Sequence, residues 1–237
     1  LDLPEMRALA VSGVDAPVQG YETDSSGAAI NAALSGSYGL GHPMPLCHPV
    51  VHASGNVGGV SPAGTLATRI CDTATQAGRT PVFVMAAAGG TDLFAEWDPA
   101  GDGRYHDLMV ANVEALLARN AANTVRGMVW CQGESSVATG YAAQFKAMID
   151  PLRVSWGAFP IVIMEHGGTP GDTGFDSMQA EQQKLATGSG DVSELAACAY
   201  VTRPAGAALE ADGIHYTGTT NRARGTEAGT VLAGMVS

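Results

Sequence analysis

Short, continuously apolar segments alternate along this chain with longer segments that carry apolar residues at helical spacing. The apolar segments are predicted to be buried strands at 80–88, 125–131, 159–165 and 195–202. Helices are predicted at 61–78, 104–120, 137–157 and 176–188, with a closing helix over 219–237. Strands that are apolar on both faces are typical of a parallel sheet covered by helices on both sides. The pattern therefore predicts an α/β fold with a mainly parallel central sheet.

The N-terminal quarter of the chain has a different character. Residues 17–23 are predicted to form a strand, whereas 24–60 are rich in Gly, Ser, Pro and His and are predicted to form a long loop over one edge of the sheet. No repeat or linker divides the sequence, so residues 1–237 are expected to fold as a single domain.

Composition narrows the class of function. The 237 residues are 46% apolar and 15% charged, and the net charge of −11 disfavours nucleic acid as a partner. The charge is compatible with a neutral sugar or a small ester. No apolar run approaches the ~18 residues that span a bilayer. The first ten residues show no basic segment followed by an apolar one, so no signal peptide is visible and the localisation stays open.

The four cysteines are widely spaced along the chain. Cys131 and Cys198 lie in strand-like apolar runs and are predicted to be buried free thiols. A single disulfide is the alternative, and Cys47 with Cys71 is the first pair to consider.

Three polar turns follow predicted strands and could carry chemistry. They read AAAGGTD, CQGESS and HGGTP. In an open parallel sheet, ligands bind outside the carboxyl ends of the strands. The Gln132 amide in the second turn could stabilise an oxyanion, and Glu134 could supply a carboxylate near a histidine. The alternative is a polar turn in which Ser135 or Ser136 caps the helix that follows.

A fourth polar segment, DGIHYTG at 212–218, precedes the closing helix. Asp212, three residues before His215, could accept a hydrogen bond from Nδ1 and leave Nε2 free as a general base. An ordinary surface loop is the alternative.

Two segments in the N-terminal half offer weaker signals. In NVGGVSPAG, the Gly58–Gly59 pair precedes a predicted helix and could present backbone N–H groups to an anion, although a tight turn is the favoured interpretation. In CHPVVH, Cys47, His48 and His52 raise the question of zinc, but their spacing matches no strong metal motif. No metal site is predicted.

Together the motifs WCQGES (130–135), DGIHY (212–216) and GGTDLFAEW (89–97) resemble the SGNH-hydrolase superfamily, and among its branches the acetylxylan-esterase and sialate O-acetylesterase-like carbohydrate esterases. The resemblance covers roughly residues 17–236. It implies a three-layer α/β/α sandwich of the flavodoxin-like kind, and ester hydrolysis without metal or cofactor. The implied substrate is a small ester or an acetylated carbohydrate.

The resemblance also implies roles for particular residues. His215 would be the general base, with Asp212 or Glu134 as its acid partner. Gln132 and a backbone N–H of Gly58 or Gly59 would form the oxyanion hole. The turn with Gly90, Thr91 and Trp97 would line the substrate pocket.

Two features of the sequence depart from this family. Ser136 stands where the family has an aspartate after Gly-Glu-Ser. The family's G-Q-S-N nucleophile block is not found in the chain, and its usual spacing would place it at or just before Leu1. Ser12 is the best substitute within the chain and Ser54 the next.

Two hypotheses of different classes follow. The first is a serine esterase that removes acetyl groups from a carbohydrate. The second is a catalytically silent carbohydrate-binding or structural domain of the same fold, motivated by the missing nucleophile block. A zinc hydrolase built on the loop from Cys47 to His52 is a distant third.

Overall fold

The computed structural model describes residues 7–10, 43–45, 65–66, 69–70, 82–86 and 90–236. Its strands are β1 (Arg7–Ala10), β2 (Pro43–Pro45), β3 (Val82–Met85), β4 (Met128–Trp130), β5 (Ile161–Met164) and β6 (Cys198–Val201). Its helices are α3 (Arg104–Arg119), α4 (Tyr141–Trp156), α5 (Thr173–Lys184) and α6 (Gly218–Val236), and residues 65–66 and 69–70 are also helical. The four buried strands and the helices predicted after residue 60 are thus confirmed within the described ranges.

The strands form two three-stranded sheets with the orders β2-β1-β3 and β4-β5-β6. Strands β4, β5 and β6 are mutually parallel, and β1 is parallel to β3. Strand β2 pairs with β1 in the antiparallel sense. Pro43 and Pro45 lack the N–H that a central strand must donate, so they fit this edge position. The sequence did not predict β1 or β2, and the strand expected at 17–23 lies outside the described residues.

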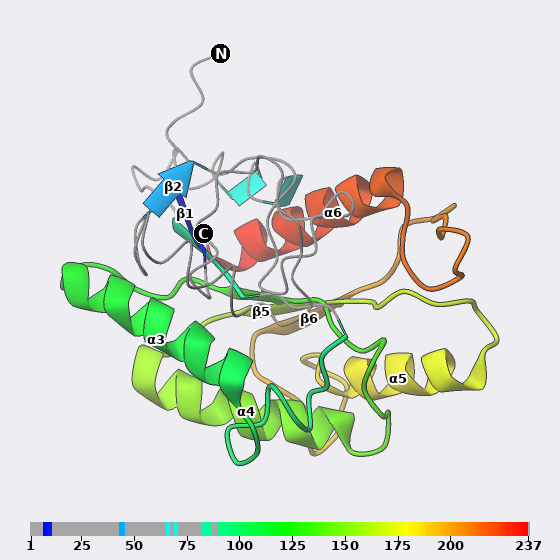
Figure 1. Cartoon of the computed structure of the whole chain (residues 1–237), viewed down its shortest axis with the longest axis horizontal. Coiled ribbons are helices and arrows are strands. Elements are labelled where there is room, and N and C mark those ends of the chain that lie inside the picture. The colour runs from blue at the N-terminus through cyan, green and yellow to red at the C-terminus, as the bar shows by residue number, and fades with distance from the viewer. Residues whose placement is uncertain are drawn as a thin grey trace, which may run out of the picture.

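The packing of β5 shows how the layers are built. Successive side chains of a strand point to opposite faces. Ile161 and Ile163 belong to the core shared with α3, α4 and α5, whereas Val162 and Met164 belong to a second core with Leu232 of α6. Figure 1 shows α6 on one side of β5 and β6 and the other three helices on the opposite side. Because both faces are covered, the strand can be apolar throughout, and the predicted three-layer α/β/α sandwich is confirmed.

Among helices α3 to α6, three boundaries differ from the sequence prediction by three or more residues. One is the end of α5, which lies at Lys184 rather than at 188. Helix α4 begins at Tyr141, after Gly140 in the left-handed conformation, rather than near Val137. Helix α5 begins at Thr173 because the Asp172 side chain accepts hydrogen bonds from the backbone of the first turn. The polar first turn of α5 carries no apolar periodicity, so the sequence pattern placed its start three residues late.

The close packing of α6 against the helical residues 65–66 and 69–70 yields a stability prediction. A methyl group added at Gly229 would lie 2.9 Å from the carbonyl oxygen of Leu66, whereas one at Gly234 meets no atom of the described residues within 4 Å. We expect Gly229→Ala to lower the free energy of unfolding by about 1–3 kcal/mol. Gly234→Ala on the same helix should raise it by about 0.5–1 kcal/mol. Urea titration of both variants checks the opposite signs.

Candidate active site

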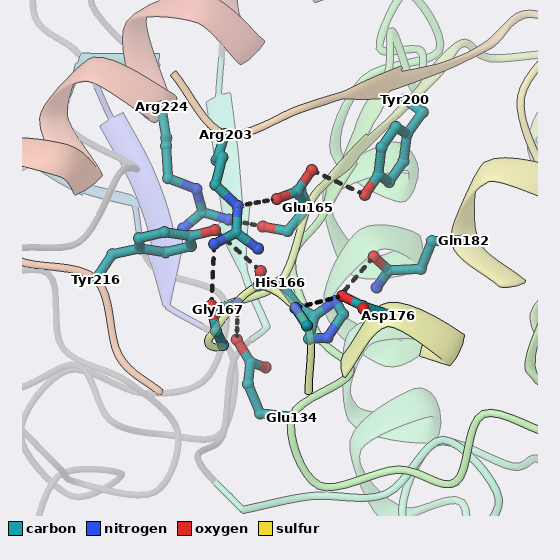
Figure 2. Close-up of polar contacts among 12 residues, drawn as sticks. Glu134, Glu165, His166, Gly167, Asp176, Gln182, Tyr200, Arg203, Tyr216 and Arg224 are labelled. Atoms are coloured by element: carbon teal, nitrogen blue, oxygen red, sulfur yellow. Dashed lines mark hydrogen bonds and ion pairs between the residues drawn. The ribbon is translucent and has the colours of Figure 1, made fainter. Parts of the chain in front are cut away.

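The turns that follow β4, β5 and β6 meet at the carboxyl end of the parallel sheet. They contribute residues 131–136, 165–169 and the long loop from 202 to 217. Figure 2 shows Glu134 from the first turn and Tyr216 from the last on either side of the β5 turn at His166 and Gly167. Three separate segments of the chain therefore meet at this end of the sheet. Two of them are turns that the strand pattern predicted, CQGESS and HGGTP, and the third is the loop that carries DGIHYTG.

His215 and Asp212 form a hydrogen-bonded pair in the loop before α6. Nδ1 of the imidazole lies 2.6 Å from Oδ2 of Asp212. The other carboxylate oxygen accepts from the backbone N–H groups of Ile214 and His215 at 2.8 and 2.9 Å. The hydrogen bond from the imidazole, together with these two backbone bonds, lowers the pKa of the Asp212 carboxyl to about 2. The carboxylate is therefore ionised at neutral pH and orients the ring through an Nδ1–H donor.

The backbone of His215 is also held in place. The Glu210 N–H donates to the His215 carbonyl oxygen at 2.7 Å, and Leu209 pairs with Tyr216 in an isolated antiparallel bridge. The side chain of His215 is nevertheless 73% exposed. Because Asp212 engages one ring nitrogen and the loop fixes the backbone, Nε2 on the far side of the ring is presented toward solvent.

Glu134 contacts the β5 turn rather than the His215–Asp212 pair. Its Oε1 accepts a hydrogen bond from the Gly167 N–H at 2.9 Å. Gly167 lies directly against the His215 loop, since a Cβ added there would be 1.9 Å from the carbonyl oxygen of Ile214. The carboxylate of Glu134 thus holds the turn on which the His215 loop rests.

Gln132 is bound to protein groups on every side of its amide. Its Nε2 donates to the Thr91 carbonyl oxygen at 2.8 Å and to the Ser136 hydroxyl at 2.7 Å, and its Oε1 accepts from the Tyr141 hydroxyl at 2.7 Å. A primary amide has two N–H donors, and both are used here. To donate to an oxyanion, Gln132 would have to release one of these acceptors. Its predicted oxyanion role stays a prediction.

Ser136 takes part in this network instead of capping α4. Its hydroxyl oxygen accepts from the Leu93 N–H at 2.9 Å as well as from Gln132. The cap residue of α4 is Gly140, so neither predicted serine caps that helix. A hydroxyl at position 136 accepts two hydrogen bonds without bringing in the carboxylate that the family carries there.

The turn at 90–97, where the resemblance implies a substrate pocket, is mostly buried or half-buried in the structure. Gly90 is exposed, but Thr91 and Trp97 are only 5% and 3% exposed. The indole N–H of Trp97 donates to the Thr91 hydroxyl at 2.9 Å, and the ring packs edge-on against Trp130 at 5.0 Å. The indole finds both its polar partner and its apolar contacts inside the core. The assignment of Gly90, Thr91 and Trp97 to the substrate pocket stays a prediction.

His166 is a buried histidine that the sequence did not single out. Its Nδ1 lies 3.3 Å from Oε1 of Gln182, whose amide nitrogen donates to the Gln132 carbonyl oxygen at 2.7 Å. This second bond fixes the Gln182 oxygen on the histidine, so Nδ1 carries the proton. Nε2 is buried and has no partner among the described residues. Burial lowers the pKa of His166, and the ring is therefore neutral at neutral pH.

The cysteines differ in burial. Cys198 is buried and free, as predicted. Cys131 is also free, and although the residue as a whole is exposed at the start of the turn after β4, its thiol is buried, accepts from the Arg224 guanidinium at 3.5 Å and has its pKa raised by burial. Trp130 itself is buried beneath that turn. Cys47 and Cys71 lie outside the described residues.

Several of the predicted site residues are in the N-terminal part of the chain. Gly58, Gly59, Ser12, Ser54 and the loop from Cys47 to His52 lie outside the described residues. Strand β1 ends at Ala10, two residues before Ser12, and runs parallel to β3.

In the described part of the chain no group of three or more His, Cys, Asp or Glu residues could hold a metal ion. Nor does any helix in those ranges have the length and apolar character needed to cross a membrane.

The fold of this chain is similar to that of a solved plant protein. The X-ray structure of the Arabidopsis thaliana protein AT4G34215, determined at 1.6 Å, superimposes on this chain with a TM-score of 0.69 and 21% identity. The match covers 83% of this chain and 78% of that one, and it shows a common fold. A search of curated proteins found no match.

The family itself is shown by a family model. The model described as carbohydrate esterase, sialic acid-specific acetylesterase, matches residues 41–233, and the chain belongs to this family. The predicted branch of the SGNH hydrolases is thereby confirmed. Membership implies an ester hydrolase.

The buried neutral His166 yields a prediction for stability against pH. Its folded pKa is lowered, so between about pH 6.5 and that lower value the unfolded state binds more protons. Stability is therefore lost as the pH falls below about 6.5, by up to about 1.4 kcal/mol per pH unit. The free energy of unfolding, measured from pH 7.5 to 5, should fall less steeply in His166→Gln than in the wild type. Equal slopes would contradict the assignment.

Proposed function

We propose that the protein hydrolyses O-acetyl esters on a carbohydrate, with His215 as general base and Asp212 as its orienting acid. The observation that carries the proposal is the 2.6 Å pair between these side chains at the carboxyl end of the parallel sheet. Membership in a carbohydrate esterase family supports the substrate class. The net charge of −11 favours a neutral acetylated sugar over a polyanion.

The geometry supports the usual two-step acyl transfer. A serine Oγ attacks the acetyl carbonyl carbon while Nε2 of His215 takes its proton, and the carboxylate of Asp212 stabilises the imidazolium through Nδ1–H. The tetrahedral intermediate expels the sugar oxygen, which receives the proton from Nε2. Water, deprotonated by the same nitrogen, then attacks the carbonyl carbon of the acetyl-serine. The second tetrahedral intermediate expels the serine oxygen, which takes the proton back from Nε2, and acetate is released. Each step requires Nε2 to be free, which is how the loop presents it.

The nucleophile and the oxyanion hole belong to the proposal as candidates. Ser12, which follows the end of β1, is the first choice in this chain and Ser54 the second. Gln132 and a backbone N–H of Gly58 or Gly59 are the proposed oxyanion donors. Losing one such donor is worth about 3 kcal/mol of barrier.

A labelling experiment identifies the nucleophile. We expect a fluorophosphonate probe to modify one serine of the active protein, and peptide mapping to locate it. Labelling of Ser12 would support the assignment, and labelling elsewhere would correct it. Absence of labelling together with absence of hydrolysis would favour the alternative, a catalytically silent carbohydrate-binding domain of the same fold.

Replacing the proposed base tests its role directly. His215→Ala should abolish turnover of p-nitrophenyl acetate while the protein stays folded, because the proposed acceptor of the serine proton would be removed. His106→Ala is the matched control, since His106 also has its Nδ1 on a neighbouring carboxylate, Asp107 at 3.0 Å, but lies on α3. Wild-type turnover in His215→Ala would rule out this base.

The two candidate acids should behave differently. Asp212→Asn removes the charge that holds the Nδ1–H tautomer, and a loss of about 10³–10⁴ in kcat is expected with little change in stability. Glu134→Gln keeps an oxygen that can accept from Gly167, so its kcat should fall only about tenfold or less. Steady-state kinetics of both variants decide between them. A larger loss in Glu134→Gln would reverse the assignment of roles.

A further inference from the structure

Tyr216, the neighbour of His215, is a buried side chain with one hydrogen bond and two cations against its ring. It is 6% exposed, and its hydroxyl donates to the His166 carbonyl oxygen at 3.0 Å. Its ring lies under two cations, with the guanidinium carbon of Arg224 4.1 Å and that of Arg203 5.7 Å from the ring centroid. Figure 2 shows both guanidinium groups next to the tyrosine ring. Burial raises the pKa of the phenol, so the hydroxyl keeps its proton and donates at neutral pH.

The two arginines are themselves fixed on the β5 turn. Arg203 donates to the carboxylate of Glu165 and, at 2.9 Å, to the Gly168 carbonyl oxygen. The Glu165 carboxylate also accepts from the Tyr200 hydroxyl at 3.3 Å. Arg224 donates to the backbone carbonyl oxygen of Glu165. The aromatic ring beside His215 is thus bound, through two cations, to the turn that Glu134 also holds.

Arg224 connects Tyr216 to α6 in a second way. Its guanidinium donates to Oδ1 of Asn221 at 3.1 Å, and Nδ2 of Asn221 donates to the Tyr216 carbonyl oxygen at 3.2 Å. The arginine is only 4% exposed, although it carries no ion pair to a carboxylate among the described residues. A buried cation without such a partner is costly, and its interactions with carbonyl oxygens and an aromatic face offset that cost. What these interactions fix is the position of Tyr216.

We propose that Tyr216 and Arg224 are positioning residues that set the place of His215 relative to the β5 turn and hence to the attacking serine. The inference rests on the proposed function, in which His215 is the base. Asp212 orients the imidazole within the loop, whereas Tyr216 and Arg224 locate the whole loop. The two tasks are separate because the Asp212–His215 bonds are all internal to residues 212–215.

This separation predicts a distinctive kinetic signature. When a substitution weakens the contacts of Tyr216 or Arg224, we expect Asp212 and His215 to move together and to keep their hydrogen bond. The pH dependence of kcat/KM should then keep its shape while kcat falls, since a displacement of about 1 Å at a reacting group can cost ~100-fold. A merely structural role would lower the melting temperature and leave kcat of the folded protein unchanged.

The test uses two variants of the full chain and a matched control. Tyr216→Phe removes only the hydroxyl that binds the His166 carbonyl, and Arg224→Lys keeps the charge but loses the planar donor set. Arg153→Lys is the control, because Arg153 of α4 also lies over an aromatic ring, Phe159 at 5.5 Å, and donates to that residue's carbonyl oxygen at 2.8 Å. We expect kcat to fall about 10- to 100-fold in the two test variants, with KM and the pH profile unchanged. Arg153→Lys should keep wild-type kcat.

A structural readout separates this inference from the proposed function. Crystal structures of the variants measure the displacement of His215 relative to Gly167, whether or not the protein hydrolyses an ester. A displaced His215 with an intact Asp212 bond supports the positioning role. An unmoved His215 with wild-type kcat in both variants overturns it. If the wild type hydrolyses no ester, the proposed function fails, and the displacement alone then decides the positioning role.

Discussion

The site depends on the close approach of the His215 loop to the turn after β5. At Gly167 there is no room for a side chain, because a Cβ would lie 1.9 Å from the Ile214 carbonyl oxygen. The same turn accepts the Tyr216 hydroxyl at the His166 carbonyl, and Thr169 donates to the Gly213 carbonyl oxygen at 3.2 Å. Gly213, Ile214 and Tyr216 of the loop therefore all contact the same turn. Since β5 is the central and fully buried strand of its sheet, this turn is a rigid support.

The two carboxylates near His215 bind different parts of the site. Asp212 lies in the loop and acts on the imidazole directly. Glu134 lies in the β4 turn and holds Gly167, so it acts on the support. Gln132 and Ser136 in turn hold the β4 turn to the backbone at Thr91 and Leu93. The three turns are cross-linked mainly by bonds from side chains to backbone.

Much of this architecture could be predicted from the sequence. The apolar runs identify strands β3 to β6 because both faces of a parallel sheet are buried, and DGIH predicts the His215–Asp212 pair because both partners lie in one turn. The contacts of Tyr216 and Arg224 could not be predicted, since Arg224 meets a carbonyl oxygen 59 residues away. Nor does the motif around Gln132 reveal that its amide is already occupied. The sequence did not predict the burial of Trp97, because a tryptophan after a glycine turn fits a pocket and a core equally well.

The central claim is that Asp212 keeps the proton of the His215 imidazole on Nδ1, and the tautomer of this ring can be measured directly. Long-range ¹H–¹⁵N NMR of the imidazole nitrogens at pH 8 distinguishes which nitrogen carries the proton. If the Asp212 carboxylate accepts from Nδ1–H, the wild type shows the Nδ1–H form with Nε2 unprotonated, and Asp212→Asn shifts toward the Nε2–H form. An Nε2–H form in the wild type would contradict this claim, because that nitrogen could then not accept a proton from the serine.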